Sequence, residues 1–231
     1  MTDQATINPT LVHCGVDWIT VTALGGKVSQ SLFEDGQLLL RQEVSSGNEK
    51  RAWSMSGFQG YKAGQAQCGV RGEEVIVRLS GDLAHDHWRD LYRDADRCTR
   101  IDVQATYRLA CQVEPVITRH YEQAKRQTAN KKRGPTLSKL STNNGPSTVY
   151  FNKRCSESFA RIYDKGGESG LDQLKNCIRY EVEYKGNEAS RVSAYLESQA
   201  QPDYAAALLA LSFLERRGVS LGKALTFSDP P

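Results

Sequence analysis

Three short stretches of the sequence place acids, bases and a tyrosine at every second position. They are TRIDVQATY from Thr99, FARIYDK from Phe159 and IRYEVEYK from Ile178. Because side chains alternate between the two faces of a β-strand, each stretch has one polar and one apolar face when extended. The sequence therefore predicts three strands whose polar faces carry chemically useful groups.

The three polar faces combine carboxylates, basic groups and one tyrosine. Their members are Arg100, Asp102, Gln104 and Thr106; Phe159, Arg161, Tyr163 and Lys165; Arg179, Glu181 and Glu183. Carboxylate oxygens suit Mg²⁺ or Mn²⁺, and guanidinium and ammonium groups suit phosphate. This combination indicates a surface for phosphoryl transfer. An ordinary solvated sheet face, with Tyr163 as a packing residue, is the alternative.

A run of basic residues from Arg119 to Arg133 contains six Lys or Arg residues against one acid, Glu122. Such a run favours contact with phosphate, and the solvated side of a helix that enters a loop is the other interpretation. The DNA contacts that we predict within this run are Lys125, Arg126, Lys131, Lys132 and Arg133.

The elements that must position these residues mix strands and helices without strict alternation, which favours an α+β fold with a largely antiparallel sheet and helices packed on one face. The predicted strands are Val16–Ala23, Glu74–Leu79, Thr99–Tyr107, Thr148–Asn152, Ser158–Lys165 and Cys177–Lys185. The predicted helices are Leu83–Asp94, Glu114–Ala129, Glu188–Ser198 and Asp203–Arg217. Ser29–Val44 fits either a helix or a strand, and Lys131–Pro146 is predicted to be a loop.

The composition, 39% hydrophobic and 25% charged with a net charge of +3, is that of a globular protein. A length of 231 residues suits one sizeable domain, or one domain with an appendage. No apolar run approaches the roughly 18 residues that span a bilayer, and Met1–Thr10 is not a secretory signal. We therefore expect a cytoplasmic protein with no membrane partner. The six cysteines are scattered, which favours reduced, mostly buried thiols over a zinc site or a disulfide scaffold.

An ordered series of segments across roughly residues 12 to 200 resembles the replication initiation factors of rolling-circle plasmids and filamentous phages. The segments are VDWITVT at Val16, GFQGYKAG at Gly57, VIVRLSG at Val75, TRIDVQ at Thr99, TVYFNKR at Thr148, FARIYDKGGESG at Phe159 and IRYEVEYKG at Ile178. The most specific part is RIYDKG followed closely by IRYEVEYKG, with TRID upstream.

The resemblance implies an enzyme of the bacterial cytoplasm that nicks and rejoins single-stranded origin DNA through a 5′-phosphotyrosine, leaving a 3′-OH that primes synthesis. Tyr163 would be the nucleophile. Asp102 and Glu181 would hold Mg²⁺ or Mn²⁺, with Glu183 as a further ligand. Lys165 and Arg161 would contact the scissile phosphate. Arg100 and Arg179 are further predicted DNA contacts.

The same resemblance places the nicking domain at residues 11–200 and a C-terminal helix and tail at 201–231. It implies single-stranded and origin DNA, a host helicase and a polymerase as partners, and it allows a homodimer. A catalytically idle DNA-binding regulator on the same fold is the alternative function. The presence of Asp102, Tyr163, Lys165 and Glu181 together favours the enzyme.

Many nicking enzymes instead use two histidines around an apolar residue, followed by a helix with Tyr-x-x-x-Lys. His85 and His87, then Tyr121 and Lys125, occur in that order here. However, the residue between the histidines, Asp86, is charged. His85 and His87 are two positions apart on a predicted helix, so their side chains point about 200° apart, which does not suit a shared metal. We reject this site and keep Tyr121 as the second candidate for the nucleophile.

Overall fold

The computed structural model describes residues 9–129, 136–141 and 146–220, which form an α+β fold as predicted. The strands are β1 (Thr10–Leu24), β2 (Arg51–Met55), β3 (Phe58–Ala63), β4 (Ala66–Arg71), β5 (Glu74–Ser80), β6 (Arg97–Arg108), β7 (Leu137–Leu140), β8 (Thr148–Phe151), β9 (Ser158–Asp164) and β10 (Cys177–Lys185). The helices are α1 (Gly26–Ser45), α2 (Gly81–Arg93), α3 (Val113–Thr128), α4 (Lys165–Ser169), α5 (Gly186–Glu197) and α6 (Pro202–Glu215), with a 3₁₀ turn at Asp172–Leu174.

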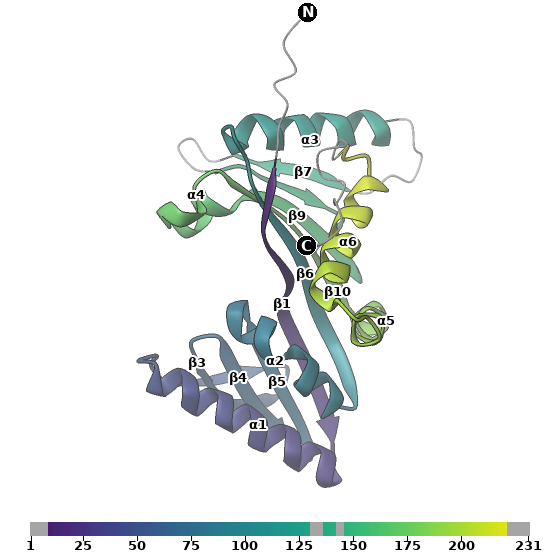
Figure 1. Cartoon of the computed structure of the whole chain (residues 1–231). Coiled ribbons are helices and arrows are strands. Elements are labelled where there is room, and N and C mark those ends of the chain that lie inside the picture. The colour runs from purple at the N-terminus through teal and green to yellow at the C-terminus, as the bar shows by residue number, and fades with distance from the viewer. Residues whose placement is uncertain (1–8, 130–135, 142–145, 221–231) are drawn as a thin grey trace, which may run out of the picture. The chain divides into compact units, whose positions relative to one another are not determined.

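The strands are hydrogen-bonded in the order β2-β3-β4-β5-β1-β6-β10-β9-β8-β7 (Figure 1). Neighbours run antiparallel from β2 through β5 to β1, and again from β7 to β9. The described residues divide into two compact units. The first unit contains the described residues up to Gly15, the segment Gln104–Val182 and the described residues from Tyr204 onward. The second unit contains the segments Val16–Val103 and Glu183–Asp203.

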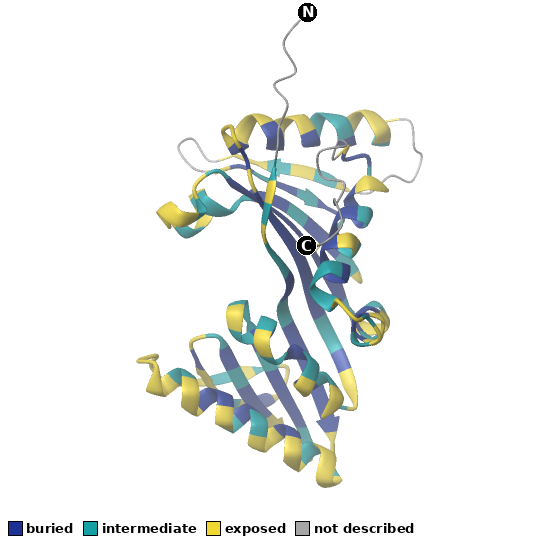
Figure 2. Cartoon of the chain, in the orientation of Figure 1, coloured by how far each residue is buried: buried dark blue, intermediate teal, exposed yellow. Residues whose placement is uncertain are grey.

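The second unit places α1 on one face of a sheet that includes β3, β4 and β5. Helix α1 approaches this face closely at Gly36, where a Cβ atom would lie 2.7 Å from Cys68 Sγ and 2.8 Å from Val77 Cγ2. A side chain at this position would therefore push the helix away from the sheet. Figure 2 shows the result, with buried strands beneath a helix whose outer side is exposed.

The first unit covers one face of its sheet with α3, which contacts β7, β8 and β9. Within this layer His120 Nε2 lies 2.9 Å from Tyr180 Oη, and both side chains are buried. Tyr180 therefore points toward α3. Because side chains alternate along β10, its neighbours Arg179 and Glu181 point toward the opposite face.

His120 makes the stability of this layer depend on pH. Burial lowers the pKa of its imidazole from 6.5 to about 4, so between these values the unfolded chain binds more protons than the folded chain. The free energy of unfolding is therefore expected to fall by about 2 kcal/mol from pH 7 to pH 5. Denaturant titrations at both pH values check this result. His120→Gln should lose most of the difference, and an equal difference in that variant would contradict it.

The structure resolves several sequence expectations. Ser29–Val44, ambiguous in sequence, belongs to α1. The prediction of a loop at Lys131–Pro146 was wrong in part, because Leu137–Leu140 forms strand β7 and pairs with β8. Composition indicated a loop there, but the ladder with β8 and the contact of Lys139 with Glu114 on α3, 2.9 Å between Nζ and Oε1, stabilise a strand.

Two further findings concern the whole described chain. Across residues 9–129, 136–141 and 146–220, no helix is both long and apolar enough to cross a membrane. All six cysteines are free thiols as predicted, but only Cys68, Cys98 and Cys177 are buried, so the prediction of mostly buried thiols was wrong in part. Burial raises the pKa of Cys68 to about 11 and that of Cys98 to about 12.

Candidate active site

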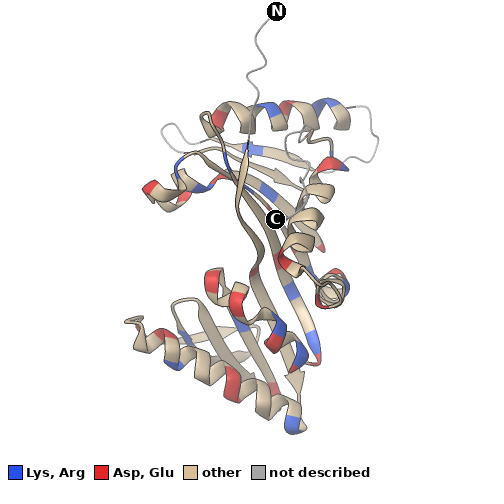
Figure 3. Cartoon of the chain, viewed as in Figure 1, with Lys and Arg blue, Asp and Glu red and all other residues tan. Residues whose placement is uncertain are grey.

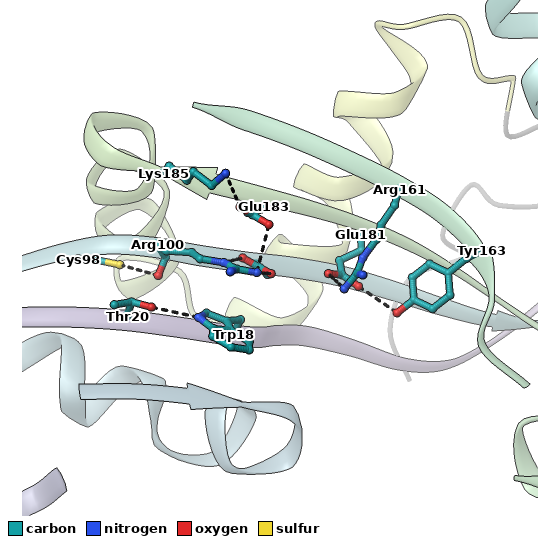
Figure 4. Close-up of polar contacts among 10 residues, drawn as sticks. Trp18, Thr20, Cys98, Arg100, Arg161, Tyr163, Glu181, Glu183 and Lys185 are labelled. Atoms are coloured by element: carbon teal, nitrogen blue, oxygen red, sulfur yellow. Dashed lines mark hydrogen bonds and ion pairs between the residues drawn. The ribbon is translucent and has the colours of Figure 1, made fainter. Parts of the chain in front are cut away.

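Tyr163 and Glu181 meet on the polar face of the first unit. Tyr163 lies on β9 and Glu181 on β10, and their side chains point toward each other (Figure 4). Tyr163 Oη donates a hydrogen bond to Glu181 Oε2 at 3.0 Å. Both residues are buried, with 4% of Tyr163 and 2% of Glu181 exposed. The predicted alternation of β9 and β10 therefore brings the candidate nucleophile against a carboxylate.

Cations flank this pair. Arg161 Nη2 donates to Glu181 Oε1 at 2.6 Å, and the Arg161 guanidinium lies 5.1 Å from the centre of the Tyr163 ring. Lys165 Nζ lies 5.9 Å from the same ring centre and pairs with Glu168 at 2.6 Å. Glu181 thus uses one oxygen for the phenol and the other for a guanidinium. Arg161 and Lys165 are only partly buried, which leaves positive charge beside Tyr163.

The protonation of Tyr163 follows from this environment. Burial raises the pKa of the Tyr163 phenol most, the negative charge of Glu181 raises it further, and Arg179 and Arg161 oppose the shift. The net direction is upward, so the resting side chain is a phenol that donates to Glu181. Nucleophilic attack by Tyr163 therefore needs an acceptor for its proton, and Glu181 is already hydrogen-bonded to it.

A buried polar chain begins at Arg179, on the same face of β10 as Glu181, and ends at His13, the one member that the sequence did not indicate. Arg179 Nε donates to Thr106 Oγ1 at 2.8 Å, and Thr106 Oγ1 donates to Gln104 Oε1 at 2.8 Å. Gln104 Nε2 in turn contacts His13 Nδ1. Only 7% of Arg179 is exposed, so this predicted DNA contact is a buried side chain on the face of the sheet. The involvement of His13, on β1, depends on strand pairing and has no local sequence signal.

Asp102 and Glu183 form a separate cluster around Arg100 in the second unit. Arg100 donates to both carboxylate oxygens of Asp102, from Nε at 2.8 Å and from Nη2 at 2.6 Å. The same Nη2 lies 3.1 Å from Glu183 Oε2, and Lys185 Nζ lies 2.6 Å from Glu183 Oε1. One guanidinium nitrogen therefore stands between two buried carboxylates (Figure 4).

The predicted metal ligands do not form an open metal site. In the part of the chain that the structure describes, no group of three or more His, Cys, Asp and Glu side chains is placed to hold a metal ion. Carboxylate oxygens suit Mg²⁺ or Mn²⁺, but those of Asp102 and Glu183 are held by Arg or Lys, and those of Glu181 are held by Arg161 and Tyr163. As arranged, these residues do not fit the ion, and we derive no step through it. Asp102 and Glu181 belong to different units, so their shared ion stays a prediction.

Arg100→Ala tests the cluster around Asp102. The variant removes the guanidinium that lies between Asp102 and Glu183, so the free energy of unfolding is expected to fall by about 3 kcal/mol. If two carboxylates then need a cation, millimolar Mn²⁺ should recover part of this loss. Thermal unfolding with and without Mn²⁺ measures both effects. Arg97→Ala, an exposed change on the same strand, is the control, and equal stability of the two variants would contradict the assignment.

The predicted basic contacts lie partly outside the described residues. Lys125 and Arg126 are exposed in the last turn of α3, whose acidic and basic residues are shown in Figure 3. Lys131, Lys132 and Arg133 lie outside the described residues. His85 and His87 fall on helix α2 as predicted, and His85 Nδ1 lies 3.9 Å from Asp203 Oδ1.

Comparison with known proteins supports the fold. No family model matches the sequence, and no curated protein matches it. Among solved structures, a rolling circle replication initiator protein from Geobacillus stearothermophilus is similar, with a TM-score of 0.57 and 16% sequence identity. The match covers 92% of this chain and 97% of that chain. At this identity the likeness shows the fold alone, which this chain shares with that protein.

Proposed function

We propose that this protein nicks and rejoins single-stranded DNA at a replication origin, with Tyr163 as the nucleophile. The observation that carries the proposal is the hydrogen bond from Tyr163 Oη to Glu181 Oε2, 3.0 Å long, with Arg161 paired to the other carboxylate oxygen. A nucleophile in contact with a proton acceptor is the arrangement that covalent catalysis requires. The fold shared with a rolling circle replication initiator protein supports the choice of DNA as substrate.

In the proposed step, Tyr163 Oη attacks a DNA phosphorus while its proton passes to Glu181 Oε2. A bond forms between Oη and phosphorus, and the bond from phosphorus to the 3′ oxygen breaks. The 3′ oxygen takes a proton from solvent and leaves as a hydroxyl. Rejoining reverses these transfers. Arg161 and Lys165 would stabilise charge on the phosphate oxygens, since both lie beside the Tyr163 ring.

The other parts of the proposal rest on the sequence. Residues 11–200 would carry the nicking activity, and 201–231 would be the C-terminal helix and tail. Arg100, Lys125, Arg126 and the segment at 131–133 are the proposed additional DNA contacts, and the buried Arg179 is left out of this set. Use of Mg²⁺ or Mn²⁺, a host helicase and polymerase as partners, and a homodimer are likewise proposals.

The proposal is tested by trapping the covalent intermediate. The full chain is incubated with single-stranded origin DNA and Mg²⁺, Mn²⁺ or EDTA, then denatured, digested and mapped by mass spectrometry. We expect a nucleotide attached to the peptide that contains Tyr163. An adduct on another tyrosine would overturn the assignment of the nucleophile. The EDTA arm reports separately whether the reaction needs a divalent ion.

A catalytically idle DNA-binding protein is the second candidate. It is favoured by one observation, that the Tyr163 hydroxyl is buried and its carboxylate partner is already neutralised by Arg161. In the nicking protein, DNA must open this contact so that phosphorus can reach Oη. Binding of origin DNA without cleavage or adduct under all three ion conditions would support the idle protein.

A further inference from the structure

The sheet of the second unit carries a basic row of side chains on one face, next to a row that contains Trp53. Strand register aligns the basic row across five strands, in the order Arg51, Lys62, Gln67, Arg78 and Thr20. The next row on the same face, two residues along each strand, is Trp53, Gly60, Gly69, Ile76 and Thr22. Neither row contains a carboxylate.

These rows lie on the face away from α1. Helix α1 approaches Cys68 and Val77, as the contact at Gly36 shows. Because side chains alternate, Gln67 and Arg78 point to the other face. There Lys62 is exposed, and Trp53 and Arg78 are partly exposed. The basic and aromatic side chains are therefore accessible.

Two tryptophans are linked by one arginine on this face. The Arg78 guanidinium lies 5.0 Å from the Trp18 ring centre and 5.8 Å from that of Trp53. Arg100 lies 4.4 Å from the Trp18 ring centre, and Trp18 Nε1 donates to Thr20 Oγ1 at 3.0 Å. The indole of Trp18 is therefore held in place by a hydrogen bond, and two guanidinium groups lie next to its ring.

The indole of Trp53 is positioned by different contacts. A Cβ atom at Gly69 would lie 2.9 Å from Trp53 Cζ3, so the glycine allows the indole to lie close against the strand. Arg78 is held beside both rings by a contact of its Nη1 with Met55 Sδ at 3.0 Å. Arg51 is paired with Glu49, so the positive charge available to a ligand comes mainly from Lys62 and Arg78.

We infer that this face, formed by Trp18, Trp53, Lys62 and Arg78, is a binding surface for single-stranded DNA distinct from the Tyr163 contact. Unpaired bases expose flat faces that stack on indoles, and phosphates pair with nearby cations. A duplex hides those base faces, so the single strand is the form that fits. The choice of DNA over RNA rests on the proposed function, whereas the surface itself rests on the contacts above.

The test measures binding without nicking. Each variant is made in the full-length Tyr163→Phe protein, and its affinity for a thymidine oligonucleotide is measured by fluorescence anisotropy. Trp53→Ala should weaken binding about tenfold, since base stacking is worth about 1–3 kcal/mol. Trp53→Phe should restore most of the affinity because it keeps a ring. Tyr61→Ala is the matched control, an aromatic residue that is 47% exposed and points to the α1 side of β3.

Salt dependence tests the cation separately. Lys62→Ala should reduce the slope of log affinity against log salt by about 0.7, the value for one phosphate contact on a single strand. Lys27→Ala, an exposed lysine on α1, removes the same charge from another surface and should leave the slope unchanged. Circular dichroism confirms that each variant is folded.

The outcomes separate this inference from the nicking proposal. Unchanged affinity of Trp53→Ala and unchanged slope of Lys62→Ala would overturn the surface, even if Tyr163 forms an adduct. Weakened binding by both variants supports the surface even if the wild-type protein never forms an adduct. If sedimentation shows that Trp53→Ala changes the oligomeric state while its DNA affinity is unchanged, the face is a protein interface. Tighter binding of a uridine oligonucleotide would overturn the choice of DNA.

Discussion

Tyr163→Phe is expected to abolish strand cleavage and the covalent adduct while single-stranded DNA remains bound. The variant removes only the hydroxyl that donates to Glu181 and keeps the buried ring. Without Oη no bond to phosphorus forms at this position, so the cleavage rate should fall at least about 10⁴-fold. The free energy of unfolding should change by only about 1 kcal/mol, the usual value of one hydrogen bond.

A gel assay for cleavage of labelled origin DNA measures the first effect, and anisotropy measures binding. Tyr121→Phe is the matched control, because Tyr121 lies in the same unit on α3 and is the second candidate for the nucleophile. Cleavage by Tyr163→Phe at the wild-type rate would end the proposed mechanism. An adduct at Tyr121, Tyr150, Tyr180 or Tyr184 would move the nucleophile to that residue.

The fold was predictable where local pattern and tertiary structure agree. Alternation predicted the ends of β6 and β9 within two residues and both ends of β10 without error, and apolar periodicity predicted α2 and α3. Prediction from local pattern failed at β7, whose four residues are stabilised by pairing with β8. Such pairing joins positions that are distant in sequence, so no local pattern reveals it.

The site was predictable as a set of residues and not as a set of contacts. Alternation correctly placed Tyr163 and Arg161 on one face of β9, and Glu181 on one face of β10. It could not show that Glu181 accepts from Tyr163, or that Arg100 lies between Asp102 and Glu183. These contacts depend on cross-strand register and on side-chain conformation, because long arginine side chains reach several neighbours.

The aromatic face of the second unit was missed for the same reason. Trp18, Trp53 and Arg78 are separated by long stretches of sequence and lie on three different strands. Only the register of β2 through β5 with β1 places Trp53 one row from Arg78. The structure also shows a role for Gly69, which makes room for the Trp53 indole.

Glu181→Gln is expected to slow cleavage by about 10²–10⁴-fold, the usual contribution of general acid–base catalysis. Glutamine keeps the size of the side chain and can accept the hydrogen bond from Tyr163, but it does not take up the proton. Attack would then depend on phenolate formed in advance. Because burial and the charge of Glu181 raise the pKa of Tyr163, that phenolate is scarce near neutral pH in the wild-type protein.

The pH profile distinguishes a proton acceptor from a residue that only positions Tyr163. Below the pKa of a phenol, the phenolate fraction rises about tenfold per pH unit, so cleavage by Glu181→Gln should rise steeply with pH. Loss of the Glu181 charge also lowers the pKa of Tyr163, which strengthens this recovery in alkali. The wild-type rate should change less over the same range, since ionised Glu181 takes the proton directly.

Single-turnover cleavage rates from pH 6 to pH 9 measure both profiles. Glu114→Gln is the control, because Glu114 is also a paired carboxylate of the first unit, held by Lys139 and Ser147. It should keep the wild-type rate and profile. If Glu181→Gln were slower by the same factor at every pH, Glu181 would act through the position of Tyr163 alone, and the proton would have to leave by another route.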